Sequence, residues 1–145
     1  MATRWALALI ALLVSSGVVP AADAADFQVI VNRANPTSSI SKGELSRIFL
    51  KKTGSWPNGR EVMALDLTAD SPVREIFSQE IHGRSVASIQ SYWQRQIFSG
   101  QAVPPVQFSS ESEVVTVVAD SPTAIGYVAG SVEVGDRVKV LELKD

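Results

Sequence analysis

The stretch DLTADSPVREIF, residues 66–77, contains the side chains of this sequence best suited to holding an anion. It is typical of a strand end, a tight turn and a helix. The first turn of a helix presents unpaired N–H groups and a partial positive charge, which bind phosphate or carboxylate. Ser71 supplies a hydroxyl at that position, Arg74 a cation and Asp70 a carboxylate. The same residues also suit an ordinary helix start, because Ser followed by Pro is a common N-terminal cap.

Two further hydroxyls, those of Ser38 and Ser39, lie in a Pro- and Ser-rich loop and are added as candidate anion ligands. Each candidate has a purely structural alternative. Arg74 can pair with Asp70 four residues earlier or extend into solvent, and the charge of Asp70 would repel an anion at the helix start. The residues alone therefore leave an anion site and a set of plain turns both open.

Patterns for catalysis or metal binding are not found in the sequence. It has no Cys, no G-x-S-x-G motif and a single His, His82, beside the helix-terminating Gly83. One His and scattered carboxylates give no metal-ligand spacing. Glu111 and Glu113 are two residues apart on a helix, so they do not face each other as an acid and a base would. We therefore expect no catalytic residue, no metal, no cofactor and no enzyme activity.

Two tyrosines are candidates for a pocket rim or an interface. Tyr92 lies about 100° round its helix from Trp93, which belongs to the apolar stripe, so Tyr92 is expected at the surface. Tyr127, in the apolar strand at 124–128, is the second candidate. A partly exposed tyrosine is also common at surfaces without a function.

The N-terminus has the pattern of an export signal. Arg4 precedes an uncharged run at residues 5–19, and the sequence ADA at 22–24 places small residues where a signal peptidase reads. Residues 1–24 are therefore predicted as a secretory signal. No later run approaches about 18 apolar residues, so we expect the mature protein not to be an integral membrane protein.

The remaining residues, 25–145, are enough for one hydrophobic core. Charge balance argues against nucleic acid, because the formal net charge of the whole chain is −2 and arginines are not clustered. Hydrophobic periodicity predicts alternating strands and helices. The expected strands are 27–31, 61–67, 124–128 and 137–143, and the expected helices are 42–50, 72–82, 86–98 and 111–120. This order predicts a single α/β domain with a mixed sheet flanked by helices.

Local signals mark the ends of the expected helices. Ser41 and Glu44 have the spacing of a capping box, which Ser110 and Glu113 repeat before the last helix. In the helix at 86–98, the residues expected to be buried on one face are Val86, Ile89, Trp93 and Ile97.

Three segments together resemble the periplasmic phosphate-binding proteins of ABC transporters. They are LSRIFLKKTGSWPNG at 45–59, DSPVREIF at 70–77 and ADSPTAIGYV at 119–128. The family has similar segments in the same order: an I-F-L-G-K-x-x-x-W motif, a serine-bearing turn before a helix, and a P-x-A-I-G-Y-V strand. The resemblance implies a single periplasmic-binding-protein-like lobe, located in the periplasm, that binds phosphate or another oxyanion without catalysis. It also implies an ABC-transporter permease or a second lobe as a partner.

Two departures limit what the resemblance implies for the site. The family turn resembles R-S-D-G-S-G-T, so Ser71 matches its serine, but Leu67 stands at the place of its Arg and Pro72 at the place of its Gly. The family also closes two lobes around its ligand, whereas this chain has residues for one. We therefore expect weak oxyanion binding, with Arg74 in place of the missing Arg. The alternative is an interaction or adaptor module that kept the fold and lost the ligand.

Overall fold

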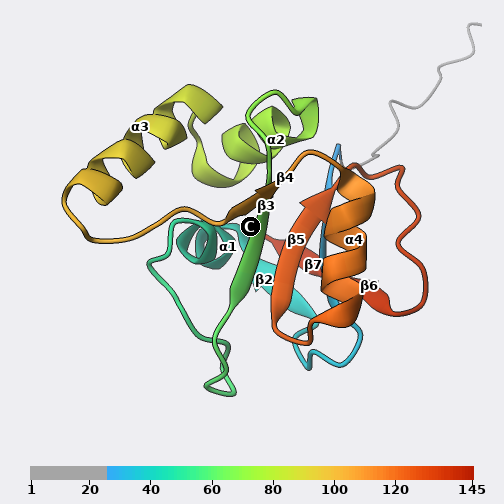
Figure 1. Ribbon diagram of the computed structural model, residues 1–145. Coiled ribbons are helices and arrows are strands. Elements are labelled where there is room, and N and C mark those ends of the chain that lie inside the picture. The colour runs from blue at the N-terminus through green and yellow to red at the C-terminus, as the bar shows by residue number, and fades with distance from the viewer. Residues whose placement is uncertain (1–25) are drawn as a thin grey trace, which may run out of the picture.

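The computed structural model describes residues 26–145, so the predicted signal at 1–24 lies outside the described residues. Five strands form a mixed sheet in the order β4-β3-β5-β1-β6 (Figure 1). Their bounds are β4 (Val106–Phe108), β3 (Met63–Leu67), β5 (Ala124–Val128), β1 (Gln28–Asn32) and β6 (Val138–Val140). Two short strands, β2 (Ser39–Ser41) and β7 (Glu142–Lys144), pair in parallel as a separate ribbon.

The direction of the strands decides which loops meet. β3 runs parallel to β4 and β5, whereas β1 runs antiparallel to β5. The carboxyl ends of β3, β4 and β5 therefore lie at one edge of the sheet, which we call the carboxyl edge. The loop that follows β1 leaves the sheet at the opposite edge.

The helices cover both faces of the sheet. They are α1 (Lys42–Phe49), α2 (Pro72–Phe77), the π-helical segment η1 (Ser78–His82), α3 (Val86–Phe98) and α4 (Glu111–Asp120). α4 packs on the face to which a side chain at Gly126 would point, because a Cβ there would lie 2.7 Å from Val114. Neighbouring strand residues face opposite sides. Tyr127 accordingly contacts Phe49 of α1 and Phe77 of α2 on the other face.

One large core and one small cluster hold the domain together. The large core includes the interior residues of β1, β3 and β5 and the inner faces of α1, α2 and α4. The small cluster consists of Leu50, Ile89 and Trp93, and it attaches α3 to the end of α1. Figure 1 shows α3 standing to one side of the sheet.

The helix signals in the sequence are confirmed with small differences. Ser41 and Glu44 form a reciprocal capping box, and Gly83 ends η1 with a left-handed φ of 65°. Ser110 caps α4 by accepting the N–H of Glu113, but Glu113 does not accept the Ser110 N–H in return, so only half of the second predicted capping box forms. The predicted helix at 72–82 is α-helical only in its first half.

Some expectations about strands and burial were wrong. The predicted strand at 137–143 is split into β6 and β7, because its first half pairs with β1 and its second half pairs with β2. β2 and β4 were not expected, since three residues are too few to show a period. Ile97 was expected in the core but is 54% exposed, because α3 extends past the cluster that buries its first half. No helix within residues 26–145 is long and apolar enough to cross a membrane.

Candidate functional site

Asp70 and Ser71, two of the predicted anion ligands, lie in the turn at residues 68–73, which is at the carboxyl edge directly after β3. The N–H of Ser71 donates to the carbonyl of Thr68 at 3.0 Å, which closes the turn. The hydroxyl of Thr68 donates to the carboxylate of Asp70 at 2.6 Å, and Asp70 itself is exposed. Asp70 is therefore held at the surface of the turn by Thr68 and not by Arg74.

Ser71 is the N-cap of α2, as the sequence predicted. Its Oγ accepts the backbone N–H of Arg74 at 3.3 Å, so its own O–H proton is free to donate elsewhere. Pro72 contributes no N–H to the first turn. The N–H of Val73 has no hydrogen-bond partner within the described residues. The turn thus has two donors without an acceptor in the described residues, a hydroxyl and a backbone N–H.

Arg74 is interior, which corrects the expectation that its charge faces an anion or pairs with Asp70. Its side chain is 3% exposed, its Nη1 donates to the carbonyl of Leu67 at 3.0 Å, and its Nε lies 3.6 Å from the Asp66 carboxylate. The guanidinium therefore joins the end of β3 to the start of α2. Within the described residues, Arg74 stabilises the turn from the protein interior through its contacts with Leu67 and Asp66.

Asp66 and Tyr127 complete this buried network. The Asp66 carboxylate accepts the N–H of Leu67 at 2.8 Å and the hydroxyl of Tyr127. Burial raises the pKa of Asp66, and the charge of Arg74 together with these hydrogen bonds opposes that rise. Burial, followed by the charge of Asp66, raises the pKa of Tyr127, so this hydroxyl stays protonated and donates.

Tyr127 is not a rim residue, contrary to the sequence expectation. Its side chain is fully buried and stacks on Phe77 with ring centroids 3.8 Å apart. The strand A-I-G-Y-V is buried at every position, so the tyrosine had no exposed face available. Tyr92 is half-buried, and its hydroxyl donates to the carbonyl of Leu50 at 3.2 Å, in the small cluster under α3.

Ser38 and Ser39 are not next to the 68–73 turn in the sheet. The loop that carries them leaves β1 at the edge opposite to the carboxyl edge, and the carbonyl of Ser38 then accepts the N–H of Glu142 at 3.0 Å. Ser39 pairs with the same residue in the β2–β7 ribbon. These serines position the C-terminal strand.

The structure brings a different serine-bearing segment beside the turn. The N–H of Thr68 donates to the carbonyl of Phe108 at 3.1 Å, which joins the ends of β3 and β4. Ser109 and Ser110 follow directly, and the Oγ of Ser110 lies 2.7 Å from that of Ser112. The capping motif at Ser110 was visible in the sequence, but its position beside residue 68 depends on the parallel pairing of β4.

Carboxylates accompany these hydroxyls at the carboxyl edge. Glu111 and Glu113 lie in the first turn of α4, and the Oε1 of Glu111 accepts the N–H of Ala129 at 3.0 Å. Asp70 adds an exposed charge, while the cation of the turn, Arg74, is paired inside with Asp66. The local field is therefore weakly unfavourable to a fully ionised anion.

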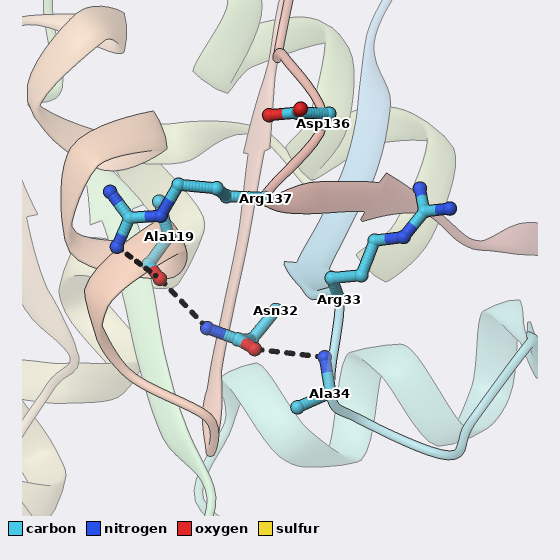
Figure 2. Close-up of a pocket in the computed structure, with 6 residues that line it drawn as sticks. All are labelled: Asn32, Arg33, Ala34, Ala119, Asp136 and Arg137. Atoms are coloured by element: carbon cyan, nitrogen blue, oxygen red, sulfur yellow. Dashed lines mark hydrogen bonds between the residues drawn. The ribbon is translucent and has the colours of Figure 1, made fainter.

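A second candidate, at the opposite edge of the sheet, is a shallow cavity of about 380 Å³. Figure 2 shows that its two arginines, Arg33 and Arg137, are directed away from each other. Arg137 pairs with Asp120 at 2.6 Å, and the amide of Asn32 donates to the carbonyls of Val118 and Ala119. The polar groups of this cavity serve the fold and do not converge on one point.

The fold is that of about half of a phosphate-transport receptor. No protein-family model and no curated protein matches the sequence. An ABC-type phosphate transport receptor from Vibrio cholerae matches with a TM-score of 0.64 and 20% identity, over 81% of this chain and 46% of that chain. A phosphate ABC transporter substrate-binding protein from Clostridium perfringens, solved with bound phosphate, matches with a TM-score of 0.63 and 17% identity, over 81% and 44%.

PstS from Borrelia burgdorferi has the same fold over 81% of this chain and 47% of its own, with a TM-score of 0.55 and 17% identity. The chain thus spans less than half the length of each of these three proteins. The expected fold, a single binding-protein-like lobe with a mixed sheet flanked by helices, is confirmed. The proteins that share it carry the names of transport and binding proteins rather than of enzymes.

Proposed function

We propose that this chain is an exported, non-enzymatic binding lobe that binds phosphate or a similar oxyanion weakly at the 68–73 turn. The observation that carries the proposal is the position of this turn. It follows β3 at the carboxyl edge, where ligands of open α/β sheets characteristically bind, and within the described residues neither the Ser71 O–H nor the Val73 N–H donates a hydrogen bond. The likeness to half of each phosphate receptor supports the choice of ligand class.

The charge of Asp70 suits one kind of oxyanion better than another. A carboxylate can accept a hydrogen bond from hydrogen phosphate, which keeps a proton near neutral pH. It can only repel sulfate, which has none. We therefore expect phosphate to bind better than sulfate, with Asp70 accepting the phosphate proton beside the donors of Ser71 and Val73.

Binding should be weak for two reasons. A single lobe leaves the anion half in water, where each hydrogen bond competes with solvent. The cation of the turn is already paired, because Arg74 contacts Asp66. The expected dissociation constant is about 100 µM or weaker, which corresponds to roughly 5.5 kcal/mol of binding free energy. Tighter binding in the periplasm would require a second lobe or an ABC-transporter permease to cover the turn.

A pair of serine variants tests the site. Ser71 and Ser85 are both N-caps whose Oγ accepts the backbone N–H three residues later, at 3.3 Å and 3.1 Å. Ser71→Ala and Ser85→Ala should each cost about 1 kcal/mol of helix stability. Only Ser71→Ala should weaken phosphate binding, by about 1 to 3 kcal/mol, since a charge-assisted hydrogen bond is lost. The measurement is an NMR titration with inorganic phosphate, and equal binding by both variants would place the site elsewhere.

The alternative function, an interaction module that lost its ligand, is favoured by the carboxylates at the carboxyl edge. Asp70 lies in the turn itself, Glu111 and Glu113 lie in the first turn of α4 at the same edge, and the Arg74 guanidinium is paired with Asp66. This alternative predicts that neither phosphate nor sulfate shifts any resonance of the turn.

A further inference from the structure

Exposed apolar side chains gather at the end of α3 and at β4. Among residues 26–145, the large hydrophobic side chains most open to solvent include Phe98 at 93%, Val103 at 68% and Val106 at 61%. Ile97 and Met63 are also exposed. We call these five residues the α3–β4 patch. Single exposed apolar residues are ordinary, but a contiguous patch marks an interaction surface.

The helix itself indicates that something covers the patch. Its apolar stripe runs through Val86, Ile89, Trp93 and Ile97, and the first three of these residues are buried. Ile97 continues this stripe beyond the small cluster of Leu50, Ile89 and Trp93 and is exposed, and the next residue, Phe98, is exposed as well. The apolar spacing of α3 therefore continues past the part of the helix that the rest of the domain buries.

A groove lies among the β3 and β4 members of the patch, and one of the residues that line it, Val103, follows Phe98 by five positions in the chain. Its volume is about 410 Å³, and its lining includes Met63, Val103, Pro104 and Val106. An exposed aromatic ring and an apolar groove on one patch are self-complementary. Self-complementarity is what a two-fold symmetric interface requires, because each contact is made twice with the roles exchanged.

The charged residues of the groove are self-complementary as well. Lys51 and Glu61 both line it and are exposed, and neither has an ion-pair partner within the described residues. Across a two-fold axis, Lys51 of one copy meets Glu61 of the other, and the reverse contact is made as well. A partner whose surface is only acidic or only basic would form an ion pair with only one of these two residues.

We propose that the α3–β4 patch is the interface of a homodimer, in which Phe98 of each copy fills the groove of the other. Side chains make the contact, and the two sheets do not join into one. The reason is that Pro104 and Pro105 precede β4, the outermost strand of the sheet, and Pro lacks the N–H that strand pairing needs. A standard interface buries about 800 Å² on each partner. An interface of that size also includes residues around the five apolar side chains, such as Lys51 and Glu61. The proposal is independent of the oxyanion site at the carboxyl edge.

Sedimentation equilibrium of the purified protein, from about 1 to 300 µM, tests the proposal. We expect a reversible dimer with a micromolar dissociation constant. Phe98→Asp should weaken it at least about tenfold, because the central ring is lost. Val140→Asp is the matched control, since Val140 is an exposed apolar residue at the other side of the sheet, on β6. This control should leave the dimer unchanged.

Exchange of the two charges gives a second, independent readout. Lys51→Glu and Glu61→Lys should each weaken the dimer by placing like charges opposite each other, and the double variant should restore it. A monomer throughout the concentration range would overturn the proposal. A dimer that is not weakened by Phe98→Asp would also overturn it, and so would a double charge variant that does not dimerise again. A monomer that binds vesicles of anionic phospholipid through Phe98 would overturn it as well.

Discussion

Replacing Arg74 by Met should destabilise the protein without removing a direct contact to a ligand. The guanidinium is the cation beside the buried Asp66 carboxylate and the donor to the carbonyl of Leu67. Breaking a buried ion pair from one side costs about 3 to 5 kcal/mol, because the remaining charge is uncompensated. Domains of this size are stable by about 5 to 15 kcal/mol. Arg74→Met should therefore remove a large fraction of the free energy of unfolding.

The control is a second arginine, Arg137, whose ion pair is exposed to solvent whereas that of Arg74 is buried. Arg137 and Asp120 lie 2.6 Å apart, but their side chains are 66% and 57% exposed. Arg137→Met should cost no more than about 1 kcal/mol, because solvent screens the pair. Urea unfolding monitored by Trp fluorescence measures both variants, with the same denaturant slope expected for each.

Two further measurements separate the ion pair from simple loss of packing. Asp66→Asn removes the buried charge, so the double variant Arg74→Met/Asp66→Asn should be more stable than the sum of the single effects predicts. The stability loss of Arg74→Met should also be smaller at about pH 4 than at about pH 7. Without Arg74, the already raised pKa of Asp66 rises further, so the carboxyl takes up a proton and its buried charge disappears as the pH falls.

The reasoning would be refuted by a loss below about 1 kcal/mol for Arg74→Met, or by strict additivity in the double variant. Either result would mean that the buried guanidinium and carboxylate do not depend on each other.

Two other predictions concern the fold. Burial, with help from the nearby Arg84 and Arg74, lowers the pKa of His82 to about 4, so the folded state favours neutral imidazole and loses stability as the pH falls from about 6.5 to 4. His82→Gln should flatten that part of the pH profile of urea midpoints. Gly126→Ala should lower the melting temperature, at a cost of about 1 to 3 kcal/mol, since its Cβ would lie 2.7 Å from Val114.

The parts of the fold that could be predicted are those with local causes. The N-caps at Ser41 and Ser71 were predicted correctly, because a cap depends on residues within one helical turn. Strand β5 was predicted residue for residue from an unbroken apolar run. The short strands β2 and β4 exist only through pairing with distant partners, so no local signal was available.

The candidate site was predicted in part, for the same reason. The turn and its capping serine are local features. The direction of Arg74 depends on Asp66, which in turn is fixed by the hydroxyl of Tyr127, 61 residues away in the sequence. Neither this network nor the approach of Ser110 to the turn could be derived from spacing along the chain.

Calorimetric titration of the purified protein with inorganic phosphate and with sulfate tests the central proposal most directly. We predict saturable phosphate binding with a dissociation constant of about 100 µM or weaker, and weaker binding of sulfate. Light scattering on the same samples gives the oligomeric state, so that binding can be referred to one lobe or to two. Micromolar phosphate binding by a strict monomer would contradict the single-lobe argument, and the absence of any oxyanion binding would contradict the proposed function.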